Sequence, residues 1–118
     1  MASRINIDHF KNLVAVSFSD GELEAPELAF MRSRAEEMGL AKDKVEELFK
    51  NAHNLEFVPP ETEEEREELL GDVVYLAMVD GEIEPPEYQL CLKVAKKLEM
   101  DQEDLDMLIK LANKLADS

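Results

Sequence analysis

Apolar residues recur along this chain with the spacing of amphipathic helices, at i, i+3, i+4 and i+7. We find no segment with the strict alternation of apolar and polar residues that is typical of a half-buried strand. The pattern therefore predicts an all-α protein with six main helices. The expected helices cover about residues 8–19, 25–38, 42–53, 62–79, 85–98 and 102–116.

Capping residues and prolines mark several ends of these helices. Asp8, Thr62 and Asp101 each precede an apolar stripe, and we expect them to be N-caps. Two consecutive prolines at residues 59–60 forbid a helix there because they lack the N–H donor that a helix needs. Residues 54–61 are therefore interpreted as a linker.

One eight-residue segment occurs twice, and the two copies lie sixty residues apart. The first copy, residues 20–27, reads Asp-Gly-Glu-Leu-Glu-Ala-Pro-Glu. The second copy, residues 80–87, reads Asp-Gly-Glu-Ile-Glu-Pro-Pro-Glu, so six of eight positions are identical. We call these segments the first and second elbow, because each is expected to join two helices.

The same offset pairs apolar with apolar residues in the flanking helices; for example, Phe18 aligns with Met78. Such self-similarity normally means that one supersecondary unit is built twice. We predict a single domain over residues 1–118. It would consist of two three-helix repeats, about residues 8–53 and 62–116, related by a pseudo-twofold axis.

The composition is strongly acidic, with 28 acidic and 13 basic residues and a net charge of −15. Residues 1–60 carry a net charge of −4, whereas residues 61–118 carry −11. This argues against nucleic acid and anionic membranes, which require clustered Lys and Arg, and it favours a protein partner with a basic surface. The sequence contains neither an apolar run that could span a membrane nor a signal pattern, so we expect a cytoplasmic protein without membrane insertion.

The residues that catalysis would need are scarce, so we expect no enzymatic activity. The two histidines, His9 and His53, fall on different expected helices, and neither has a paired nucleophile. The single cysteine, Cys91, lies among apolar residues, where packing is a better interpretation than reactivity.

The acidic residues of the elbows have a structural interpretation. Glu24 and Glu84 occupy the cap position of the following helix. Glu27 and Glu87 come three residues later, where a carboxylate can accept a hydrogen bond from the backbone N–H of the cap residue. Asp-Gly is a turn dipeptide, in which the aspartate can bond nearby N–H groups.

The same carboxylates are also candidate ligands of a divalent cation, Ca²⁺ or Mg²⁺. Each elbow holds four acidic residues in eight, and hard cations require several convergent oxygens. The spacing is not that of an EF-hand, because Val16 and Phe18 would stand where that loop needs oxygen ligands. The candidate metal ligands are Asp20, Glu24, Glu27, Asp80, Glu84 and Glu87.

The elbows resemble those of the TerB-like family, which includes the tellurite-resistance TerB fold and the N-terminal domain of a membrane-associated bacterial J-protein. The resemblance rests on Asp-Gly, an apolar residue and a helix-opening Glu, present twice. It implies a helical domain on the cytoplasmic side that binds metal ions through acidic residues and scaffolds stress-response complexes. The implied ligands are Asp20, Glu27, Asp80 and Glu87. Glu24 and Glu84 depart from the family, which often has a small hydroxyl residue there.

Two functions therefore stay open at this point. The first is a non-enzymatic acidic binding or scaffold module of the stress-response type, with a divalent cation at the elbows. The alternative is a purely structural or protein-interaction domain in which the acidic motifs serve only as helix caps. The sequence does not indicate the oligomeric state.

Overall fold

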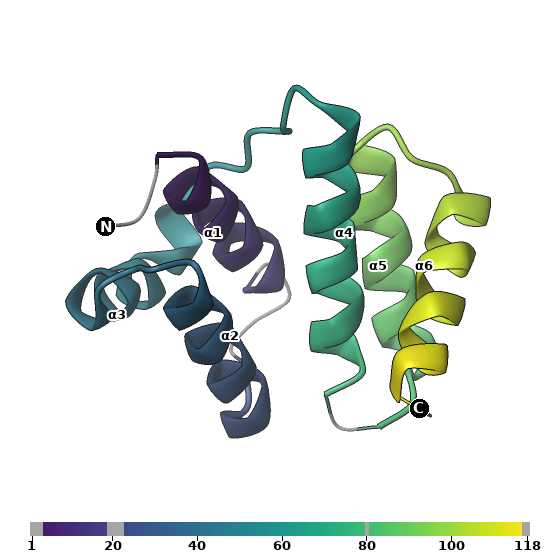
Figure 1. The fold of residues 1–118 in the computed structure, drawn as a ribbon, viewed down its shortest axis with the longest axis horizontal. Coiled ribbons are helices and arrows are strands. Elements are labelled where there is room, and N and C mark those ends of the chain that lie inside the picture. Colours follow the sequence, from purple (N-terminus) through teal and green to yellow (C-terminus); the bar gives the residue numbers. More distant parts are fainter. Residues whose placement is uncertain (1–3, 19–22, 80, 117–118) are drawn as a thin grey trace. The chain divides into compact units, whose positions relative to one another are not determined.

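The computed structural model describes residues 4–18, 23–79 and 81–116, and the regular structure within these ranges is entirely helical. The predicted all-α class is confirmed, with six α-helices and no strand in the described ranges. The chain divides into two units, Met1–Val58 and Pro59–Ser118 (Figure 1), which we call unit 1 and unit 2.

Unit 1 contains α1 (Arg4–Ser17), α2 (Ala25–Glu37), α3 (Lys42–Lys50) and the 3₁₀ turn η1 (Ala52–Asn54). The expected start at Asp8 is wrong, because α1 already begins at Arg4. The Asn6 side chain donates a hydrogen bond of 3.1 Å to the carbonyl of Met38, at the end of α2. This bond holds the first turn of α1, and Asp8 lies inside the helix.

The expected third helix also ends earlier than predicted. Helix α3 stops at Lys50, and residues 52–54 form the 3₁₀ turn η1. Asn51 donates its side-chain N–H to the carbonyl of Glu47 at 2.9 Å. This local bond takes up a carbonyl at the helix end, so the chain leaves the α-helix there.

The core of unit 1 forms around α1, where Phe10, Leu13 and Val14 are fully buried. The linker is held to this helix by one amide side chain. Asn12 donates to the carbonyl of Val58 at 2.7 Å and accepts from its N–H at 3.0 Å. Both backbone polar groups of Val58 are thereby satisfied within unit 1.

Unit 2 contains α4 (Glu63–Ala77), α5 (Pro85–Lys97) and α6 (Gln102–Ala116). The three helices lie side by side (Figure 1), and each contacts the other two. The expected caps at Thr62 and Asp101 are confirmed. The Thr62 hydroxyl accepts from the N–H of Glu65 at 3.2 Å, and Asp101 exchanges two such bonds with Asp104 at 2.9 and 3.1 Å.

Cys91 of α5 is fully buried in the core of unit 2. Burial raises the pKa of its thiol to about 11, because the thiolate would lose its hydration. The neutral thiol therefore packs as a small apolar side chain, as the sequence suggested. Among the other described residues of unit 2, the fully buried side chains are Leu69, Leu70, Val74, Ala95, Leu98 and Leu105.

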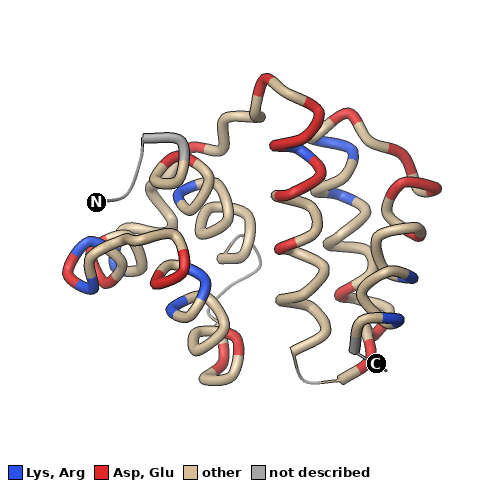
Figure 2. The backbone as a smooth tube through the Cα atoms, viewed as in Figure 1, with Lys and Arg blue, Asp and Glu red and all other residues tan. Residues whose placement is uncertain are grey.

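Acidic positions recur along the backbone of unit 2 in Figure 2, especially in the first turns of α4 and α6. Carboxylates near a helix N-terminus interact favourably with the helix dipole. Across the described ranges, no helix combines the length and apolar character that crossing a membrane requires.

Candidate functional site

The two elbows place their glutamates in the same local geometry. Glu24 precedes α2 and Glu84 precedes α5, both with extended backbone. The N–H of Glu24 donates to Oε1 of Glu27 at 3.0 Å, and the N–H of Glu84 donates to Oε1 of Glu87 at 2.9 Å. Each pair forms a capping box, so the structural interpretation of these four glutamates is confirmed.

The structure describes four of the six proposed cation ligands. Asp20 and Asp80 lie outside the described residues. Within the described residues, no group of three or more His, Cys, Asp or Glu side chains is arranged to hold a metal ion. The capping bonds commit one carboxylate oxygen each of Glu27 and Glu87. Binding of Ca²⁺ or Mg²⁺ at the elbows stays a prediction.

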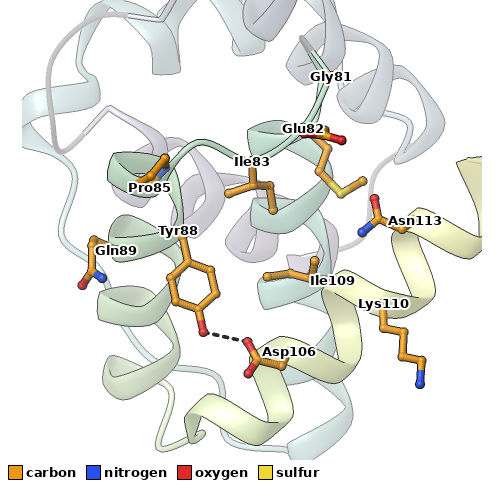
Figure 3. Close-up of a pocket in the computed structure, with 11 residues that line it drawn as sticks. Gly81, Glu82, Ile83, Pro85, Tyr88, Gln89, Asp106, Ile109, Lys110 and Asn113 are labelled. Carbon is orange, nitrogen blue, oxygen red and sulfur yellow. Dashed lines mark hydrogen bonds between the residues drawn. The ribbon is translucent and has the colours of Figure 1, made fainter.

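An open groove of about 1150 Å³ lies beside the second elbow, within unit 2 (Figure 3). It runs between the first turns of α5 and residues 106–113 of α6. The structure places the side chains of Ile83, Tyr88 and Ile109 toward this space, whereas Lys110 turns away from it. The groove is lined by Met78, Gly81, Glu82, Ile83, Pro85, Tyr88, Gln89, Asp106, Ile109, Lys110 and Asn113.

Polar contacts fix one end of the groove. The Tyr88 hydroxyl on α5 donates to Oδ1 of Asp106 on α6 at 2.6 Å, and Gln102 donates to the same hydroxyl at 3.1 Å. The bond to Asp106 raises the pKa of Tyr88, because it stabilises the neutral phenol beside a carboxylate. These contacts join α5 to α6 and set the width of the groove at this point.

The backbone of the second elbow shapes the opposite end. Gly81 has a φ of 124°, which side chains with a Cβ rarely adopt. Two residues later, Ile83 is half-buried among the lining residues. The elbow therefore contributes an apolar side chain to the groove in addition to capping α5.

The groove was missed by the sequence reasoning, which singled out the carboxylates of the elbows. Of the four proposed ligands that the structure describes, Glu24, Glu27, Glu84 and Glu87, none lines the groove. The signal that could have found it is the difference in size between aligned residues of the two halves, such as Phe18 and Met78.

Comparison with known proteins gives no relative for this chain. No family model, no curated protein and no solved structure matches it. The resemblance to the TerB-like family therefore stays a prediction. Function has to be inferred from the charge and geometry of this chain alone.

Proposed function

We propose that this protein is a non-enzymatic binding module that holds a protein partner with a basic surface, and that unit 2 is the docking part. The observation that carries the proposal is the uneven charge. Unit 2 has seventeen acidic and six basic residues, whereas the first sixty residues have eleven and seven. A surface of one sign attracts partners of the opposite sign and speeds their encounter.

Helix capping accounts for only part of this acidity. Glu63, Glu64 and Glu65 lie in the first turn of α4, where the helix dipole favours them. Glu67 and Glu68 continue the series beyond that turn, and both side chains are exposed. The negative surface thus extends past the positions that the helix itself requires.

The finer architecture belongs to the same proposal. We infer that the two units are copies of one TerB-like three-helix repeat. The support is the sixty-residue offset in the sequence together with matching capping boxes at the starts of α2 and α5. In this interpretation the elbows serve the fold in both copies, and the excess acidity of unit 2 serves binding.

A panel of synthetic fifteen-residue peptides tests the proposal. Each basic peptide is paired with a version in which Lys and Arg are replaced by Glu, and binding to the whole chain is followed by fluorescence anisotropy between 50 and 300 mM salt. We expect only the basic peptides to bind, and their affinity should fall with salt, because screening weakens interactions between exposed charges.

Two charge-matched triple variants locate the binding surface. The variant E63Q/E64Q/E67Q in unit 2 should weaken binding, whereas E36Q/E47Q/E56Q in unit 1 should leave it nearly unchanged. Equal effects of the two variants would remove the assignment to unit 2. Equal binding of basic and acidic peptides, or no binding of either, would overturn the proposed function.

A further inference from the structure

We propose that the groove between α5 and α6 binds a peptide segment of the partner whose apolar side chains are flanked by Lys or Arg. This inference rests on the proposed function and assigns it a docking site with a defined chemistry. It combines three observations: a half-exposed apolar floor, an acidic edge, and a difference between the two units at aligned positions.

The floor of the groove is apolar and incompletely covered. Met78, Ile83 and Ile109 come from the end of α4, the elbow and α6, and all three side chains are only half-buried. Covering such side chains with a partner's apolar groups is favourable, because apolar surface leaves water. The groove is open rather than enclosed, which suits an extended or helical segment better than a small molecule.

The edge of the groove is negatively charged. Glu82 stands on the elbow and Asp106 on α6, and both are exposed (Figure 3). Tyr88 occupies one oxygen of Asp106, but a carboxylate has several acceptor positions, so Asp106 can accept a further bond from Lys or Arg. Among the described residues that line the groove, Lys110 alone is basic, and its side chain points away from the groove.

Unit 1 fills the aligned positions with aromatic rings. Phe18 and Phe49, which align with Met78 and Ile109, have ring centroids 5.8 Å apart. Phe18 is 7% exposed, whereas Met78 is half-buried. Met78 and Ile109 fill less volume between the helices than the two phenylalanine rings do. In unit 2 the groove lies at these two positions.

A cation also lies over one of the two rings in unit 1. The guanidinium of Arg32 lies 5.4 Å from the ring centroid of Phe49 and bonds the carboxylate of Glu46 at 2.8 Å. The residues of unit 2 at these positions are Leu92 and Asp106. In unit 1, Arg32 therefore contacts both an aromatic side chain, Phe49, and a carboxylate, Glu46, of the same unit. We infer that in unit 2 the partner supplies the corresponding basic group.

The test uses a synthetic amphipathic peptide with Leu on one helical face and Lys and Arg beside it. A scrambled peptide of identical composition is the control for charge alone. Binding to the full chain is measured by fluorescence anisotropy, and the contact surface is mapped by changes in ¹H–¹⁵N chemical shifts. We expect the largest shifts at groove residues such as Ile83 and Ile109, and at least tenfold weaker binding of the scrambled peptide.

The variant I109F introduces the residue that unit 1 has at the aligned position, and it should fill the groove. We expect it to weaken peptide binding at least tenfold. The variant M78F should fill the groove from a second position. Circular dichroism is used to check that each variant is folded. The matched control is M107S on the same helix, because Met107 is 65% exposed and does not line the groove. It should leave the affinity within twofold.

The acidic edge is tested separately with E82Q/D106N, which should weaken binding and flatten its dependence on salt. Shifts that map to another surface, such as the face of α6 that carries the exposed Met107 and Leu111, would overturn the groove while leaving the proposed function in place. The same holds if folded I109F and M78F bind the peptide normally. Failure of every basic peptide would instead remove both proposals.

Discussion

Replacing Glu87 by alanine should destabilise α5, whereas replacing it by glutamine should cost less. The carboxylate of Glu87 accepts the N–H of Glu84 at 2.9 Å and completes a capping box. Loss of a capping side chain typically costs about 1 kcal/mol. Loss of a negative charge near a helix N-terminus costs about 0.3–1 kcal/mol. We therefore expect E87A, which loses both contributions, to cost about 1–2 kcal/mol. E87Q loses the charge but keeps an acceptor oxygen, so it should cost about 0.3–1 kcal/mol.

The assay is urea denaturation followed by circular dichroism, and the first elbow provides a replicate. Glu27 accepts the N–H of Glu24 at 3.0 Å, so E27A and E27Q should reproduce the same order. The control is E82Q, which removes a charge from the second elbow at an exposed residue outside the box. We expect its free energy of unfolding to stay within about 0.5 kcal/mol of the wild type.

The reasoning is refuted if E87Q loses as much stability as E87A, since the acceptor oxygen would then contribute nothing. The cation hypothesis makes a separate prediction. Millimolar Ca²⁺ or Mg²⁺ should raise the Tm above its value in K⁺ at equal ionic strength, and D80N/E87Q should lose this rise while keeping its helicity. If the wild type shows no rise, specific cation binding at the elbows is wrong.

Four further experiments test the local structure. G71A should raise the stability of unit 2 by about 0.5–1 kcal/mol, since a Cβ there meets no atom within 4 Å and alanine favours helix. G81A should lower the stability of unit 2 by about 1–3 kcal/mol, although a Cβ there also meets no atom within 4 Å, because alanine is strained at the φ of 124°. Urea denaturation measures the effects of G71A and G81A. Native Cys91 should resist iodoacetamide at pH 8 and react once urea unfolds the protein; rapid native labelling would contradict its burial. D106N should lower the raised pKa of Tyr88, read at 295 nm in a Y75F background. The Tyr88–Asp106 bond should therefore contribute its full stabilisation of the folded protein below pH about 10. This contribution is lost as the pH rises through the raised pKa of Tyr88.

Local signals predicted most of the helical structure. The start of α2 at Ala25 and the cap at Thr62 follow from residues within one turn of each helix end, so the sequence contains the whole cause. The start of α1 was missed because Asn6 bonds the carbonyl of Met38, thirty-two residues away. No pattern within α1 itself carries that information.

The candidate site divides in the same way. The capping boxes were predictable, because both partners lie within four residues of each other. The groove was harder to predict, because it is made by Ile83, Tyr88 and Ile109 from three separate segments, and only the size difference between aligned residues of the two halves indicates it. Whether such side chains leave space depends on how the helices pack, and helical periodicity marks Ile109 only as a core-facing position.

The duplication separates what the fold needs from what differs between the copies. The capping glutamates, Glu24 and Glu27 in one copy and Glu84 and Glu87 in the other, are identical, and single hydrogen bonds of the capping boxes explain them. An identity that local folding already explains is weak support for a ligand. The pair Phe49 and Ile109 differs in volume at aligned positions of two units that share their helix order. Because both residues satisfy the same helical pattern, folding alone does not require the difference, and this favours the groove over the capping glutamates as the place where the proposed partner would bind.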